Sequence, residues 1–157
     1  MVDEDNGSEV PSDHTPAPRV VSFLLADRAE VSQNKLYVMG GNVDTFVVQG
    51  FPAIVQFGVA TVTEVPYGFA NKPVELIIIF EDQAGSELAR VGVVMIAGRP
   101  DWLPLNVPQR IPFAVPQILL NIQAEGTYTI RSLLAGHSTK HMSFQVRSAE
   151  TSDDAPQ

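Results

Sequence analysis

The chain has 157 residues, enough for one hydrophobic core, and its 45% apolar and 18% charged residues are typical of a globular domain. Its net charge of −8 comes from the ends: residues 1–19 and 148–157 hold eight acidic residues and one basic, whereas residues 20–147 hold ten acidic and nine basic. A nearly neutral interior without a basic stripe argues against nucleic acid as a partner, and the absence of cysteine excludes disulfides and zinc–thiolate sites.

The acidic ends of the chain cannot bury enough apolar surface to offset the entropy of ordering. We therefore predict disordered tails at 1–19 and 148–157 around one domain of residues 20–147. The first ten residues, MVDEDNGSEV, include no apolar segment of the kind that a secretory signal needs. No apolar run reaches the ~18 residues of a membrane span, so the sequence predicts a cytoplasmic protein that does not contact a membrane.

Between the tails, short runs rich in Val, Ile, Leu and Phe alternate with Gly, Pro, Asn and Asp, which is typical of strands and turns. One helical turn is expected at 66–72. The expected strands are 20–26, 35–40, 43–49, 53–64, 73–81, 87–97, 110–116, 126–134 and 140–147. This pattern predicts an antiparallel β-sandwich of about eight or nine strands, immunoglobulin-like or a similar Greek key. A small β-barrel is the alternative.

The glycine pair in KLYVMGGNVDTF (35–46) could belong to a phosphate-binding loop or to a turn between strands. A phosphate loop needs a helix after it, because the N-terminal amides of the helix hold the anion. The residues that follow Gly41 are β-branched and aromatic, which favours a strand. We therefore predict a tight turn in which Gly40, Gly41 and Asn42 supply positive φ angles.

Residues 74–96 predict a hairpin around Gly85. A loop at 82–85 would place Phe80 opposite Glu87 and Ile78 opposite Ala89. One face would then be a core face, made of Val74, Leu76, Ile78, Phe80, Ala89, Val91 and Val93. The other face is too apolar for simple exposure, so it is covered either by a loop of this chain or by another subunit. Its apolar residues form the candidate interface: Ile77, Ile79, Leu88 and Val94.

The segment AGRPDWLPLNVPQR (97–110) holds three prolines and the only tryptophan, so a stiff loop is expected. Either Trp102 folds back to cap the sandwich, with Arg99 and Asp101 in water, or the loop presents Trp102 as a binding anchor. We favour the first alternative. Arg99, Asp101 and Trp102 are the candidate binding residues.

Residues 125–146 predict a second hairpin, with Tyr128, Ile130 and Leu134 on one face. Its start, Gly-Thr-Tyr, is compatible with a tyrosine corner or with an ordinary half-buried tyrosine. His137 and His141 flank the hairpin tip without a third ligand, and His14 lies in the N-terminal tail, so no metal site is expected. The Glu81-Asp82 pair falls at a turn, where both charges meet water. The sequence therefore offers no catalytic residues and no cofactor site.

Four blocks of the chain, SFLLADRAEVSQNKLYVMGG (22–41), GRPDWLP (98–104), PQRIPFAVP (108–116) and GTYTIRSLLAG…SFQV (126–146), resemble a family of small bacterial proteins of unknown function, DUF6941. The resemblance covers about residues 20–147 and implies a compact all-β domain with no assigned activity. It brings no catalytic or binding residues with it. The chain departs from the expected pattern after the glycines, where Asn42-Val43-Asp44 replaces an aromatic residue.

The sequence thus favours a non-enzymatic domain that acts as a protein-interaction or structural module, with a protein partner or a second copy of itself. The alternative is a β-sandwich that binds a small molecule or a carbohydrate through the 97–110 loop. An enzyme is disfavoured, because no nucleophile, acid or base stands in a recognisable constellation.

Overall fold

The computed structural model describes residues 16–149, which form nine strands and one short 3-10 turn, η1. The elements are β1 (Arg19–Ser32), β2 (Lys35–Gly41), β3 (Thr45–Val48), β4 (Ala53–Val65), η1 (Tyr67–Phe69), β5 (Pro73–Glu81), β6 (Glu87–Ile96), β7 (Gln109–Ile122), β8 (Gly126–Leu134) and β9 (His137–Ser148). The nine predicted strands and the turn at 66–72 are present, although β1 and β7 each run six residues past the predicted ends at 26 and 116. The predicted disordered tails fall largely on residues 1–15 and 150–157, outside the described residues.

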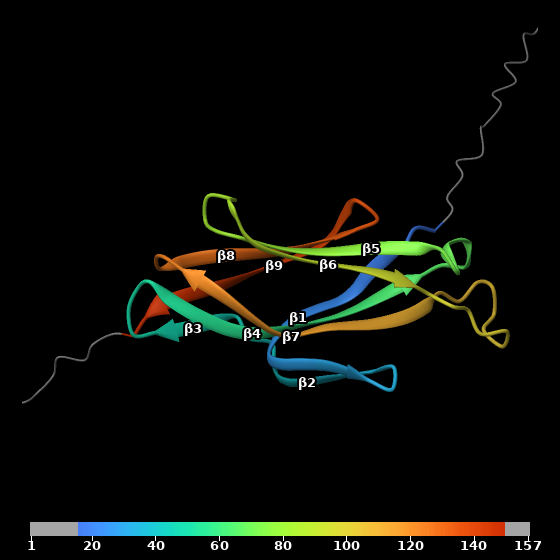
Figure 1. Cartoon of the computed structure of the whole chain (residues 1–157), viewed down its shortest axis with the longest axis horizontal. Helices are drawn as coiled ribbons and strands as arrows, with labels where there is room; N and C mark the ends of the chain where they lie inside the picture. Colours follow the sequence, from blue (N-terminus) through green and yellow to red (C-terminus); the bar gives the residue numbers. More distant parts are fainter. Residues whose placement is uncertain (1–15, 150–157) are drawn as a thin grey trace, which may run out of the picture.

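The strands form two sheets that face each other, as the β-sandwich prediction requires (Figure 1). The four-stranded sheet has the order β2-β1-β4-β7, and the five-stranded sheet has the order β3-β9-β8-β5-β6. Neighbouring strands are antiparallel, except that β3 runs parallel to β9. The core between the sheets holds the inward residues of β1, β4, β5, β7, β8 and β9, together with Met95 of β6. No helix within residues 16–149 is long and apolar enough to cross a membrane.

Strand β7 extends six residues beyond the predicted end at 116. Proline has no backbone N–H and interrupts a central strand, which is why the run seemed to stop at Pro116. However, β7 is the edge strand of its sheet, so only one of its sides needs hydrogen bonds to a neighbour. Pro112 and Pro116 are therefore both tolerated, and residues 118–122 pair with the start of β4.

The glycine pair forms a turn, as predicted, but not a hairpin. Gly40 and Asn42 have positive φ angles of 61° and 67°, whereas Gly41, which was also predicted to have one, does not. The chain then leaves β2 in one sheet and enters β3 in the other. The amides of Asn42 and Val43 both donate to the carbonyl of Leu25, at 2.9 and 3.4 Å, which fixes the point of crossing. These residues therefore set the path of the backbone between the two layers.

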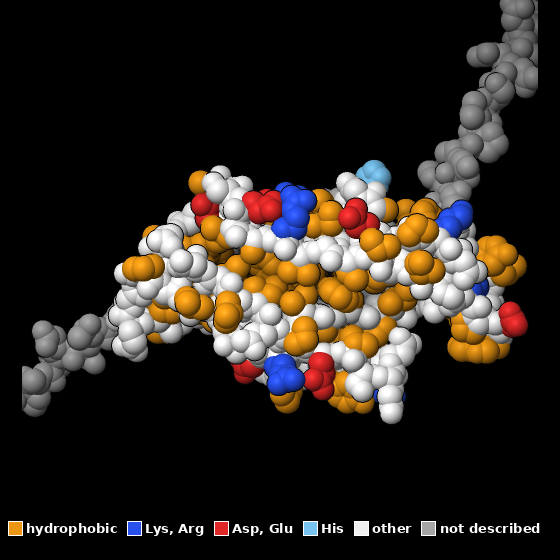
Figure 2. Space-filling view, in the orientation of Figure 1, with side chains coloured by type: hydrophobic (Ala, Val, Ile, Leu, Met, Phe, Trp, Pro, Cys, Tyr) orange, Lys and Arg blue, Asp and Glu red, His pale blue; other side chains and the backbone are white. Residues whose placement is uncertain are grey.

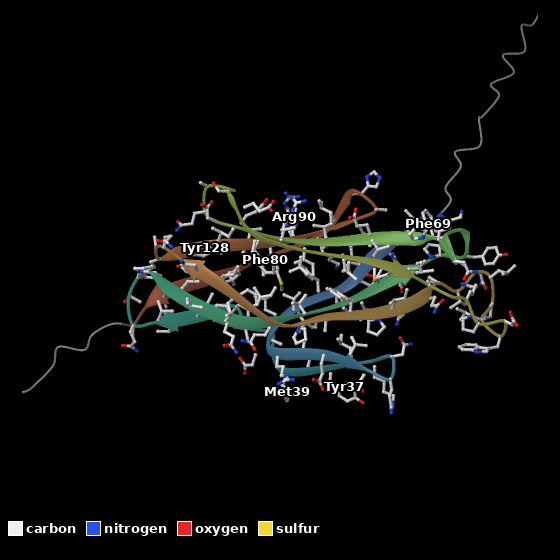
Figure 3. All side chains as sticks on the ribbon, viewed as in Figure 1. Tyr37, Met39, Phe69, Phe80, Arg90 and Tyr128 are labelled. Carbon is white, nitrogen blue, oxygen red and sulfur yellow. The ribbon has the colours of Figure 1, made fainter. Side chains whose placement is uncertain are left out.

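The β1–β2 hairpin belongs to the four-stranded sheet, and its closed end bends below β4 and β7 (Figure 1). It closes through Gln33 and Asn34, which both have positive φ angles, as a two-residue hairpin loop requires. Its Ala29 is fully buried over Gly58 of β4, and a Cβ at Gly58 would lie 2.8 Å from the backbone N of Ala29. Tyr37 and Met39 point away from the sandwich on the opposite face of the hairpin (Figure 3).

The β5–β6 hairpin has the predicted faces but a different register. Phe80 pairs with Ala89 and not with Glu87, a shift of two residues. The amide of Asp82 donates to the carbonyl of Ser86, so the loop is one residue longer than expected. An irregularity in the pairing between Phe80 and Glu81 shifts the register by one residue more. A shift of two residues preserves which side chains face the core, so the predicted core face is correct.

The tyrosine corner is present. The hydroxyl of Tyr128, at the start of β8, donates to the carbonyl of Ala124 at 2.6 Å, and the ring is buried. The ring also stacks on Phe144 of β9, with the ring centroids 5.6 Å apart. One side chain thus links the incoming loop to the core, which favours this alternative over an ordinary half-buried tyrosine.

Candidate binding site

One end of the sandwich gathers the start of β1, the end of β4, η1 and the loop between β6 and β7. Figure 1 shows this loop projecting beyond the sheets at the right of the view, and apolar side chains crowd that end of the surface in Figure 2. We call residues 97–108 the presented loop. The candidate binding residues Arg99, Asp101 and Trp102 all belong to it.

Arg99 holds the presented loop in shape. Its Nη2 donates to the carbonyls of Leu103, Pro104 and Val107, with distances of 3.4 Å to the first and 2.8 Å to the last. The guanidinium also lies over the ring of Tyr67 from η1, 5.4 Å from its centroid. Since the loop carbonyls converge on one charged donor, the loop is tied to itself and to η1. The prediction that Arg99 stands in water is wrong.

Trp102 is presented to solvent. Trp102 is 79% exposed, so the favoured expectation that its side chain caps the sandwich is wrong. Asp101 is exposed beside it, as predicted. Leu105 and Tyr67 are exposed as well. The contacts of Arg99 explain this exposure: Arg99 occupies the interior of the loop, and the turn from Pro100 to Leu103, closed by an N–O distance of 3.1 Å, carries Trp102 at its tip.

Three charged residues form a row across adjacent strands at the same end, and we call them the arginine triad: Arg19, Glu64 and Arg110. Glu64 of β4 pairs in register with Arg19 of β1 and with Arg110 of β7. Its Oε2 accepts from Arg19 at 2.7 Å, and its Oε1 accepts from Arg110 at 3.0 Å. The Glu64 side chain is only 6% exposed, whereas those of the two arginines are 70% and 72% exposed.

The hydrogen bonds from Arg19, and then those from Arg110, hold the pKa of Glu64 below its usual value of 4.5, against the opposing effect of burial. The triad therefore stabilises the fold at pH values above the ordinary pKa of glutamate. That contribution is lost as the pH falls through the lowered pKa of the folded state.

Replacing Glu64 with glutamine is expected to lower the free energy of unfolding by about 1 kcal/mol at pH 7, because the guanidiniums are largely in water. The difference from the wild type should shrink as the pH falls below 4.5, which urea unfolding at pH 7, 5 and 3 would measure. Glu30→Gln is the control, since Glu30 is exposed and, among residues 16–149, its ion pair is with Arg28 alone, at 3.4 Å. A pH-independent loss at Glu64 would contradict the role of its charge.

An open cavity of about 670 Å³ lies between the triad and the presented loop. We call it the end cavity. Arg19 and Glu64 contribute its charged side, and Tyr67 and Leu105 contribute apolar walls. Prolines 16, 66 and 108 line it as well. The cavity thus combines an ionic edge with rigid apolar surfaces, which is the usual composition of a ligand site.

The predicted interface on the outer face of the five-stranded sheet is only partly exposed. Ile79 is 1% exposed, because it sits between Arg90 of β6 and Arg131 of β8, its direct neighbours in register. Glu87 and Glu81 hold these arginines at 2.7 and 2.8 Å, so ion pairs of the same sheet cover Ile79. Ile77 is half-buried, and only Leu88 and Val94 are exposed. Neither predicted cover, a loop or another subunit, accounts for the burial of Ile79.

The histidines do not extend the site. His137 and His141 are exposed, and His14 lies outside the described residues. Within residues 16–149, no three His, Cys, Asp or Glu side chains are grouped so that they could hold a metal ion.

Sequence reasoning missed the arginine triad and Tyr67. One signal was available for Glu64: it is a lone carboxylate at the end of the apolar run VQFGVATVTEV. A carboxylate inside a buried strand needs a cationic partner. Its partners, however, lie 45 and 46 positions away along the chain, and only the strand order identifies them.

Residues 21–147 match the family of unknown function DUF6941. No curated protein shows a significant match to the chain. Among solved structures, an alkylpurine DNA glycosylase from Pseudomonas fluorescens, AlkC, bound to DNA containing an abasic site analog, is 10% identical with a TM-score of 0.45. It matches over 83% of this chain, which spans 30% of the glycosylase. The CARDB domain of a Pyrococcus furiosus protein in complex with di-metal ions is 9% identical, with a TM-score of 0.35, and the match covers 82% of this chain and 94% of that domain.

Proposed function

The chain belongs to the family of unknown function DUF6941, and on that premise we propose that it is a non-enzymatic, cytoplasmic interaction module that binds a protein partner through the presented loop. The observation that carries this proposal is the exposure of Trp102 on a loop that Arg99 holds in shape. Tryptophan is enriched among the residues that dominate binding energy at protein interfaces. The loop is already ordered by its own hydrogen bonds. Binding of a partner would therefore not carry the entropic cost of ordering this loop.

A binding role without catalysis is also supported by the state of the carboxylates. Glu64 and Glu87 both accept hydrogen bonds from arginines, which stabilises the ionised form of each carboxylate. The hydrogen bond from Arg90 lowers the pKa of Glu87, just as the triad lowers that of Glu64. General acid catalysis needs the opposite, a carboxyl whose pKa is raised towards neutrality.

Replacing Trp102 with alanine is expected to remove binding without loss of fold, since the side chain is in water. Truncation of an interface hot spot costs about 2 kcal/mol or more, or roughly thirtyfold in affinity. The test is a quantitative pull-down from cells that contain the native protein, with wild type, Trp102→Ala and Tyr37→Ala as baits. Tyr37 is a matched control, because it is an exposed aromatic residue on β2.

The expected result is a partner that wild type and Tyr37→Ala both capture and that Trp102→Ala loses. Direct titration of that purified partner with the three proteins would then give the ratio of affinities. If all three baits retain the same proteins in the same amounts, the presented loop is not the binding surface and the proposal fails.

Carbohydrate binding is a second candidate, and the exposure of both Tyr67 and Trp102 at one end of the sandwich favours it. Aromatic faces of this kind can stack on sugar rings. A glycan array probed with wild type and Trp102→Ala separates the two functions: a glycan bound by the wild type and lost in the variant would favour the sugar.

A further inference from the structure

The end cavity is formed by parts of the chain that are far apart in sequence. The start of β1 contributes Arg19, the end of β4 contributes Glu64, η1 contributes Tyr67, and the presented loop contributes Leu105. Trp102 is not among its lining residues. Its volume of about 670 Å³ lies within the ~300–1,000 Å³ range that is usual for sites of small ligands.

The arginine triad leaves an excess of positive charge beside this cavity. Two guanidiniums share one carboxylate, so the three side chains together carry one net positive charge. Arg110 uses its Nε and Nη2 on Oε1, which leaves only Oε2 of Glu64 for Arg19. Arg19 is therefore held in place by Glu64 but is not fully neutralised by it.

Arg19 also has donors to spare. Its Nε and Nη2 both reach Glu64, at 2.9 and 2.7 Å. Within residues 16–149, its Nη1 has no acceptor, and its side chain is largely exposed. A guanidinium carries five N–H donors in a rigid fork that matches the two oxygens of a carboxylate. Orientation by Glu64 therefore prepares Arg19 for an additional acidic group.

We propose that the end cavity binds an amphipathic carboxylate, with its acidic group on Arg19 and its apolar part against Tyr67 and Leu105. A single negative charge matches the net charge of the triad, whereas a phosphate monoester would bring nearly two. The apolar walls of Tyr67, Leu105 and the prolines favour a ligand with a hydrophobic body next to that charge. This inference goes beyond the proposed function, because it assigns a ligand to a cavity that Trp102 does not line.

Such a carboxylate has two sources, the C-terminus of a peptide that ends in an apolar residue and a free amphipathic acid. The experiment therefore titrates the full chain, by calorimetry and by amide chemical shifts, with a hexapeptide that ends in phenylalanine and with octanoate. The same hexapeptide with an amidated C-terminus and octanol are the uncharged controls. Saturable binding of the peptide acid or of octanoate, at least tenfold tighter than its uncharged control, supports the proposal and identifies the source.

Two variants locate the site. Arg19→Gln should weaken binding of the acid at least tenfold and leave the uncharged control unchanged, because it removes the positive charge and the forked N–H donors that would hold the acidic group. Leu105→Ala should weaken both, since it removes an apolar wall. Arg28→Gln is the matched control: Arg28 is also an exposed, ion-paired arginine of β1, and this change should leave binding intact. Trp102→Ala should leave it intact as well.

The proposal is overturned if neither acid binds at concentrations up to about 10 mM. It is also overturned if acid and uncharged control bind equally, or if Arg19→Gln and Arg28→Gln have the same effect. Finally, suppose that heat of binding is released while the amide chemical shifts of Tyr67 and Leu105 stay unchanged. The ligand would then bind elsewhere, and the proposal would be overturned.

Discussion

Replacing Phe57 with alanine is expected to lower the free energy of unfolding by about 3–5 kcal/mol, the usual cost of truncating a buried phenylalanine. Phe57 of β4 is fully buried, and its ring centroid lies 5.4 Å from that of Phe46, 5.6 Å from that of Phe144 and 5.9 Å from that of Phe80. Figure 3 shows Phe80 between the two layers. Phe57 comes from the four-stranded sheet and its three partners from the five-stranded sheet, so the cavity left by its removal would open between the sheets.

Urea unfolding measures this effect as a lower midpoint at an unchanged slope. Ile54→Ala is the matched control: it truncates an apolar residue of the same strand whose side chain is exposed, and a change within about 0.5 kcal/mol is expected. If the two variants lose the same amount, Phe57 does not hold the sheets together.

Replacing Gly58 with alanine is expected to cost about 3 kcal/mol, towards the upper end for the insertion of one methyl group into a packed site. The new Cβ would lie 2.8 Å from the backbone N of Ala29, 3.0 Å from the carbonyl O of Pro116 and 3.2 Å from the carbonyl C of Arg28. All three atoms belong to the backbone, so no side chain can rotate away. The β1–β2 hairpin would have to lift from β4, which would expose Ala29.

Gly92→Ala is the control for this change. Gly92 lies in β6, where an added Cβ would meet nothing within 4 Å, so the same substitution should be neutral or stabilise the protein by up to about 1 kcal/mol. Thermal unfolding of the two variants gives the comparison. Faster hydrogen exchange in residues 26–41 of Gly58→Ala would show that the hairpin is the part that moves. Equal melting temperatures for the two variants would contradict the close approach of the hairpin.

The strands and their inward faces were predictable because these properties depend on neighbouring residues. Alternation with a period of two identified the core side of β5 through Leu76, Ile78 and Phe80, and that assignment survived a register error of two residues. The requirement for positive φ at Gly40 and Asn42 is likewise local. The end of β7 was missed because the tolerance of Pro116 depends on its strand being at the sheet edge.

The candidate site was predictable only in part. The prolines and the tryptophan of residues 97–108 marked a stiff loop, and the loop is ordered. The direction of Trp102 was not predictable, since it follows from the carbonyls that Arg99 bonds and from the position of Tyr67 beneath that guanidinium. The predicted interface was likewise only partly correct. Leu88 and Val94 are exposed, but ion pairs across three strands cover Ile79, and those pairs depend on which strands are neighbours.

The sequence by itself determined the all-β class, the positions of the nine strands and the turn residues, since backbone preference and side-chain alternation act over a few residues. Only the tertiary structure decided which strands are neighbours. The order β1-β4-β7 brings Arg19, Glu64 and Arg110 into one row, and the fold of the β1–β2 hairpin buries Ala29 against Gly58. These contacts join residues that are 29 or more positions apart, and their formation depends on packing of the whole domain rather than on any local pattern.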